Sequence, residues 1–112
     1  MLTPEQAIQH QFEAYNAHDL ERFLRVYDDA VKVYRPPASE PSMAGKAALA
    51  EFYGKQRFTL PNLRAELLNR MVIGNKVVDH ERVHGLGEKE FEVAVVYEVS
   101  NGLITSVWIF AA

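Results

Sequence analysis

Asp79 and Glu81 are a pair of carboxylates whose positions in the chain suit acid/base catalysis. They lie two positions apart in a segment with the pattern of a β-strand, so their side chains share one face of the sheet. Val77 and Val83 have the same parity, which indicates that this face is buried. Two nearby carboxylates repel each other, which can raise one pKa and create an acid and a base near neutrality. We therefore predict an acid/base site here.

The same segment allows a structural interpretation. Asp79 and Glu81 could instead form a ladder of salt bridges with Arg70 or Arg82 on an exposed or interface face. His80, Arg82 and His84 have the opposite parity, and we expect them to face solvent or a partner chain; they become the functional set only if the parity is inverted. Two histidines four residues apart on a strand are too distant to chelate one metal ion, so we predict no metal site.

Helices must precede this strand, because the first part of the chain has helical periodicity. Thr3 is a good N-cap with Pro4 after it, and Gln6 has the spacing of a capping box. Asp19 has the position of an N-cap for a short second helix over residues 20–27. A third helix is predicted over residues 46–58. The apolar positions at helical spacing are Ile8, Phe12 and Tyr15, then Leu20, Phe23, Leu24 and Tyr27, then Leu49, Phe52 and Tyr53.

The second half of the chain changes to the period of a strand. Strands are predicted over residues 30–34, 63–73, 76–84, 91–99 and 103–110, and Asn101-Gly102 is a strong hairpin signal. In the strand 63–73 the odd positions are the more apolar face. The order predicts an α+β fold with three helices packed on one face of a curved, mainly antiparallel sheet, as one domain over residues 1–112.

Composition excludes several classes of function. The 112 residues are 48% hydrophobic and 24% charged, as in an ordinary globular domain. A net charge of −3 with scattered basic residues argues against nucleic-acid binding. The absence of cysteine rules out disulfides and thiol chemistry. No apolar run could span a membrane and the N-terminal residues do not have the pattern of a signal peptide, so a reducing cytoplasm is the expected location.

Short motifs add a resemblance over nearly the whole chain. They are the segments 16–20 (NAHDL), 27–30 (YDDA), 45–53 (GKAALAEFY) and 97–108 (YEVSNGLITSVW). In this order they resemble the nuclear transport factor 2-like superfamily, which includes SnoaL-like polyketide cyclases, ketosteroid isomerases and limonene-epoxide hydrolases. The resemblance implies a cystatin-like cone with an open mouth, a small hydrophobic ligand and chemistry without a cofactor.

The first half is most similar to bacterial ketosteroid isomerases. That family uses an aspartate base, a donor tyrosine and a protonated aspartic acid. The position of the aspartate base corresponds to Tyr34 or Arg35 of this chain. The donor tyrosine corresponds to a position near Gln11, and the aspartic acid to one near Val96. None of the three positions has the residue type of the family. Tyr15 lies one helical turn from the tyrosine position and could project into the cavity.

An interior rich in aromatic residues would be plain core in most domains, whereas in this cone part of it would line a pocket. These aromatic residues are Tyr15, Tyr27, Tyr34, Phe52, Tyr53, Phe58, Tyr97, Trp108 and Phe110. The predicted catalytic residues are Asp79, Glu81 and Tyr34. The predicted ligand-binding residues are Tyr15, Phe52, Asn69, Tyr97 and Trp108.

Two functions remain open at this point. The first is a cofactor-independent isomerase, cyclase or hydrolase in which Asp79 or the pair with Glu81 moves a proton, and Tyr34 or Tyr15 donates a hydrogen bond to an oxyanion. The second is a non-catalytic ligand-binding or dimerisation module. The last strand is apolar on both faces, which predicts a homodimer formed through the sheet.

Overall fold

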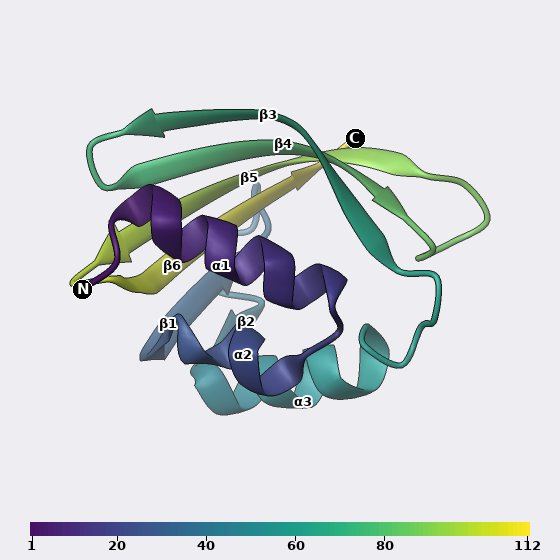
Figure 1. Cartoon of the computed structure of the whole chain (residues 1–112), viewed down its shortest axis with the longest axis horizontal. Coiled ribbons are helices and arrows are strands. Elements are labelled where there is room, and N and C mark those ends of the chain that lie inside the picture. The colour runs from purple at the N-terminus through teal and green to yellow at the C-terminus, as the bar shows by residue number, and fades with distance from the viewer.

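The computed structural model describes all residues 1–112 and consists of three helices and one sheet of six strands (Figure 1). In chain order the elements are α1 (Pro4–Asn16), α2 (Leu20–Arg25), β1 (Tyr27–Tyr34), β2 (Met43–Ala44), α3 (Lys46–Gln56), β3 (Arg64–Ile73), β4 (Lys76–His84), β5 (Phe91–Ser100) and β6 (Leu103–Ala111). The α+β prediction and the order of the long elements are confirmed. The two-residue strand β2 was not predicted, because two residues are too few to show a period.

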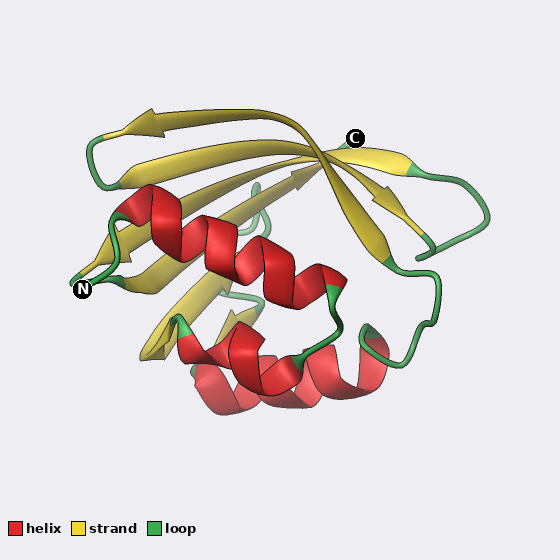
Figure 2. Ribbon diagram, in the orientation of Figure 1, coloured by secondary structure: helices red, strands yellow, loops and turns green.

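The sheet is curved and carries its helices on one side (Figure 2). The strand order is β2-β1-β6-β5-β4-β3, with every neighbouring pair antiparallel except β1 and β6. Helix α1 crosses the inner face of the curve, while α2 and α3 lie beside β1 (Figure 1). A pocket lies between α1 and the inner face of the sheet. No helix is both long enough and apolar enough to span a membrane.

Both predicted helix caps are present. The side chain of Thr3 accepts a hydrogen bond from the backbone N–H of Gln6, whose own side chain accepts one from the N–H of Thr3. Asp19 accepts a hydrogen bond from the N–H of Arg22 at the start of α2. These bonds satisfy N–H groups that the first turn of a helix leaves without partners, so α1 begins at a defined residue.

The end of α1 and the turn that follows it are attached to the start of β3 by side chains. Asn16 both donates to the carbonyl of Ala65 and accepts from its N–H, at 2.9 and 2.7 Å, as a neighbouring strand would. The ring of His18 lies 2.8 Å from the carbonyl oxygen of Leu63 and stacks on Phe58. His18 is therefore part of the packing.

Strand β3 contains a bulge that reverses its parity. Its register against β4 shifts between Leu67 and Asn69, and beyond this point Arg70 lies opposite Asp79. The prediction that the odd positions form one apolar face is therefore wrong for the second half of β3, where Met71 and Ile73 are exposed. An inserted residue moves every following side chain to the other face, and here it turns an arginine inward.

Candidate active site

Strand β4 alternates as its valines predict. Val77, Asp79, Glu81 and Val83 are buried, and the residues between them are half-buried or exposed. The side chain of Asp79 has no exposed surface and Glu81 is 7% exposed. The inward direction of both carboxylates is thereby confirmed. Their surroundings differ.

Asp79 is held by a bidentate ion pair. Arg70 donates from Nε and Nη2 to the two carboxylate oxygens, at 2.7 and 2.9 Å, and its Nη1 donates to Oε1 of Gln9 on α1 at 2.8 Å. This pairing compensates the charge that burial would otherwise penalise. Asp79 does not line the pocket described below. Its predicted partnership with Arg70 is present, but inside the protein and not on an exposed face.

Glu81 has no such partner. Its side chain makes no ion pair or hydrogen bond, and it lies in the wall of a pocket. Burial raises the pKa of Glu81 from its ordinary value of 4.5 to about 7, and the negative charge of Asp79 adds to the rise while Arg70 opposes it. A carboxyl group that is half-protonated near neutral pH can act as either a base or an acid.

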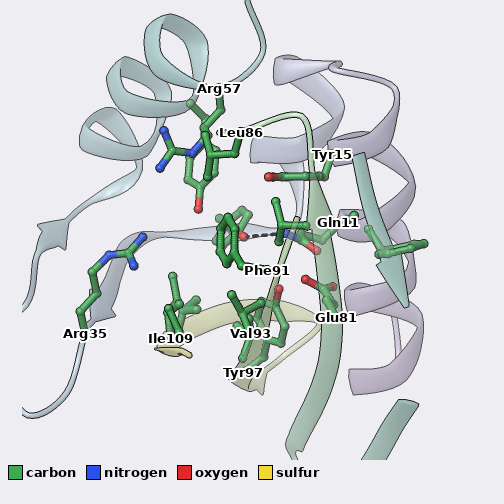
Figure 3. A pocket seen from close by; sticks show the side chains of 18 residues that line it. Gln11, Tyr15, Arg35, Arg57, Glu81, Leu86, Phe91, Val93, Tyr97 and Ile109 are labelled. Atoms are coloured by element: carbon green, nitrogen blue, oxygen red, sulfur yellow. Dashed lines mark hydrogen bonds between the residues drawn. The ribbon is translucent and has the colours of Figure 1, made fainter. Parts of the chain in front are cut away.

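The pocket is a cavity of about 130 Å³ between α1 and the inner face of the sheet (Figure 3). An apolar cavity of roughly 150 Å³ holds benzene, so the enclosed part fits one small ring. Fourteen of the 18 lining residues are hydrophobic. The lining consists of Gln11, Phe12, Tyr15, Tyr27, Arg35, Tyr53, Arg57, Ala65, Glu81, Val83, Leu86, Phe91, Val93, Val95, Tyr97, Val107, Ile109 and Ala111.

Tyrosines supply further polar groups to the cavity. Burial raises the pKa of Tyr15, Tyr27 and Tyr97, so these phenols stay protonated and can donate hydrogen bonds. The oxygen of Tyr27 accepts a bond from Nε2 of Gln11 at 3.2 Å, which leaves its own proton free to donate (Figure 3). The cavity thus combines one carboxyl group with several neutral donors.

Two arginines lie on the side of the pocket opposite Glu81 (Figure 3). Arg35 directly follows β1 and is exposed, while Arg57 follows α3 and is half-buried. Ala111, also exposed, lies in the same lining, whereas Gln11, Glu81 and Tyr97 are buried. The arginines therefore mark the mouth of the pocket and Glu81 marks its inner end.

Several predicted site residues lie elsewhere. Tyr34 and Trp108 are not part of the pocket lining; their rings stack, with centroids 5.7 Å apart, on the outer face of the sheet. The inward positions of β1 are taken by Val31 and Val33, so the even-numbered Tyr34 must point outward. Tyr15 and Tyr97 do line the pocket.

Phe52 and Asn69 also lie outside the lining. Phe52 carries the guanidinium of Arg57 over its ring, 4.6 Å from the centroid. Asn69 is exposed on the edge strand, next to the bulge. Three polar lining residues were not predicted: Gln11, Arg35 and Arg57. Gln11 lies on the same helical face as Ile8 and Tyr15, and this spacing could have identified it as a pocket residue. No local pattern indicates the two arginines.

The residues give no candidate for a metal centre. No group of three or more histidine, aspartate or glutamate side chains is placed to hold a metal ion. The polar groups of the pocket are one carboxyl, one amide, tyrosine hydroxyls and two guanidinium groups. This set is suited to transferring a proton and stabilising an oxyanion.

Comparisons with known proteins agree with this fold. A family model described as a SnoaL-like domain matches residues 8–107. No curated protein sequence matches the chain. An uncharacterized cystatin fold protein from Novosphingobium aromaticivorans superposes with a TM-score of 0.88 at 17% identity, covering 97% of this chain and 98% of the other.

Two further solved structures have the same fold. A SnoaL-like protein of unknown function from Burkholderia thailandensis gives a TM-score of 0.79 at 22% identity, covering 97% of this chain and 93% of that one. A nuclear transport factor 2-like protein of unknown function from Cytophaga hutchinsonii gives 0.84 at 14% identity, covering 100% and 92%.

Proposed function

The chain belongs to the SnoaL-like family, and on that premise we propose that it is a cofactor-independent acid/base enzyme acting on a small hydrophobic molecule. The observation that carries the proposal is Glu81: a buried carboxyl group, free of ion pairs, in the wall of an apolar pocket. Unpaired buried carboxyls are costly, and perturbed ones concentrate at functional sites. Asp79, paired with Arg70, is assigned no direct contact with the substrate.

The proposed reaction is a proton transfer at a carbon next to a carbonyl group. The carboxylate of Glu81 takes the proton, and the electron pair of the C–H bond moves to the carbonyl oxygen to form an enolate. Hydrogen bonds from the hydroxyls of Tyr97, Tyr27 or Tyr15 stabilise the negative oxygen. Return of the proton from Glu81 to the same or another carbon completes an exchange or an isomerisation. The family supports small-molecule chemistry in general and leaves the substrate open.

Exchange of α-protons tests this proposal without knowledge of the natural substrate. Cyclohexanone and cyclohexenone, which match the size of the enclosed cavity, are incubated with the protein in D₂O, and deuterium uptake is followed by NMR. We expect exchange above the buffer rate for at least one ketone, with a fall of about a hundredfold or more in Glu81→Gln. The matched control is Glu88→Gln, in the exposed turn after β4. Exchange by Glu81→Gln at the wild-type rate would contradict the proposal.

A ligand-binding module without turnover is the second candidate. The observation that favours it is the Arg70–Asp79 ion pair, which neutralises one of the two inward carboxylates. In that case the ketones bind in the pocket and perturb its amide signals, but wild-type protein and Glu81→Gln exchange protons equally slowly. The experiment above therefore separates the two functions.

We also propose a homodimer formed through the outer face of the sheet. Cross-strand neighbours make an apolar row across five strands of this face: Met71, Val78, Val96, Trp108 and Tyr34. The helices all lie on the other face (Figure 2). A second copy with the same row would cover it in a two-fold arrangement.

A further inference from the structure

The mouth of the pocket has a charge opposite to that of the protein. The chain has 15 acidic and 12 basic residues, yet the pocket lining contains one acidic residue, Glu81 at the inner end, and two arginines at the mouth. Neither Arg35 nor Arg57 lies within ion-pair distance of a carboxylate. The two positive charges are thus available to a ligand.

The arginines are also held near the cavity. Arg57 donates from Nη1 to the carbonyl of Gln56 at 3.1 Å and packs on the ring of Phe52, which restricts its side chain. Arg35 is followed by two prolines, which stiffen the backbone behind it. Burial raises the pKa of Tyr53, a lining residue, and the charges of Arg35 and Arg57 oppose that rise. Both charges are therefore close enough to act on a group inside the pocket.

We propose that Arg35 and Arg57 bind an anionic end of the ligand, so that the ligand is an amphipathic carboxylic acid with an apolar body. Guanidinium groups match the planar geometry of a carboxylate. The apolar body occupies the cavity, whose walls are Val83, Val93 and Val95, and the far end reaches Glu81 (Figure 3). The anion site rests on the proposed acid/base function in one respect only, the placement of the reacting end of the ligand at Glu81.

A matched pair of probes tests the anion site. 3-Phenylpropanoate has one ring and one carboxylate, and 3-phenylpropanamide has the same shape without the charge. Their dissociation constants are measured at pH 7 and low salt by NMR titration of the labelled protein. We expect the acid to bind about tenfold more tightly than the amide, and added salt to reduce the difference.

We expect Arg35→Gln and Arg57→Gln each to raise the dissociation constant of the acid several-fold and to leave that of the amide unchanged. Arg64→Gln, on an exposed position outside the lining, is the matched control and should affect neither probe. Equal affinity for acid and amide, equal loss of both in the arginine variants, or no binding of the acid to the wild-type protein would overturn the anion site.

The two proposals fail in different ways. Suppose that Glu81→Gln catalyses proton exchange at the wild-type rate while the arginine variants lose affinity only for the acid. The acid/base function is then wrong and the anion site stands. If Glu81→Gln loses exchange while acid and amide bind alike, the function stands and the ligand has no anionic end.

Discussion

At the scale of single residues, the decisive contrast is between two carboxylates on one face of β4. Asp79 is paired with Arg70, which is itself bonded to Gln9. Glu81, two positions further on, lies among hydrophobic side chains and tyrosines. A carboxyl group that is buried without a partner favours its neutral form. The neighbouring charge of Asp79 strengthens this preference in Glu81, while Arg70 limits it. The ion pair thus contributes to the pKa of the proposed base from outside the pocket.

The raised pKa of Glu81 predicts a pH-dependent cost to stability. In the folded protein the pKa is about 7 instead of 4.5, so between these values the folded state holds a proton that the unfolded state has lost. The free energy of unfolding therefore falls as pH rises from 4.5 to 7, by about 3 kcal/mol from this group. Urea unfolding at several pH values is expected to show Glu81→Gln gaining stability relative to the wild type over this interval. A constant difference between the two proteins would contradict the raised pKa.

At the scale of elements, a side chain forms the hydrogen bonds that a neighbouring strand would form at the edge of the sheet. β3 is an edge strand, and near its start its free backbone groups at Ala65 are bonded by the amide of Asn16. The same turn places His18 against Leu63. These contacts attach the end of α1 to β3, and α1 carries Gln11 and Tyr15 of the pocket. The position of the helical wall therefore depends on the turn that follows it.

Removal of this attachment is expected to weaken the fold. Asn16→Ala deletes both hydrogen bonds and leaves backbone groups of the buried Ala65 without partners, which should lower the free energy of unfolding by about 2 kcal/mol. Asn75→Ala, in the exposed turn between β3 and β4, is the control and should change it by less than about 0.5 kcal/mol. Chemical denaturation measures both. Equal stability of the two variants would show that the attachment contributes little.

At the scale of the whole molecule, the curved sheet has two faces with different roles. The inner face, under α1, provides the pocket, and the outer face carries the apolar row together with the exposed Phe110. Tyr34 and Trp108, expected in the pocket, contribute to this second surface. The proposed dimer would place the two pockets on opposite sides of the assembly, each open to solvent.

A charge in the middle of the apolar row tests the dimer. In sedimentation velocity experiments we expect wild-type protein to sediment as a dimer and Val96→Glu as a monomer, because a two-fold axis brings the two introduced charges near each other in an apolar interface. Val72→Glu is the matched control: Val72 is 43% exposed and lies opposite Val77, whose side chain points to the inner face. A wild-type monomer at micromolar concentration would contradict the proposal.

Local patterns in the sequence predict the long elements and their order, the caps at Thr3 and Asp19, and the inward direction of Asp79 and Glu81. Each of these depends on periods and hydrogen bonds within a few residues. The bulge in β3, by contrast, was visible only in the pairing with β4, and it decided which arginine meets Asp79. Only the tertiary structure could separate the paired carboxylate from the free one.

The same reason explains the pocket. Gln11, Arg35 and Arg57 come from three different elements or their ends. Only the packing of α1 and α3 against the sheet that contains β1 brings them to one cavity. Tyr34 and Trp108 are residue types that are common in binding sites, but their positions in β1 and β6 direct their side chains to the outer face. Local patterns determine the face to which a side chain points, whereas the packing of segments that are distant in the sequence determines which residues it contacts.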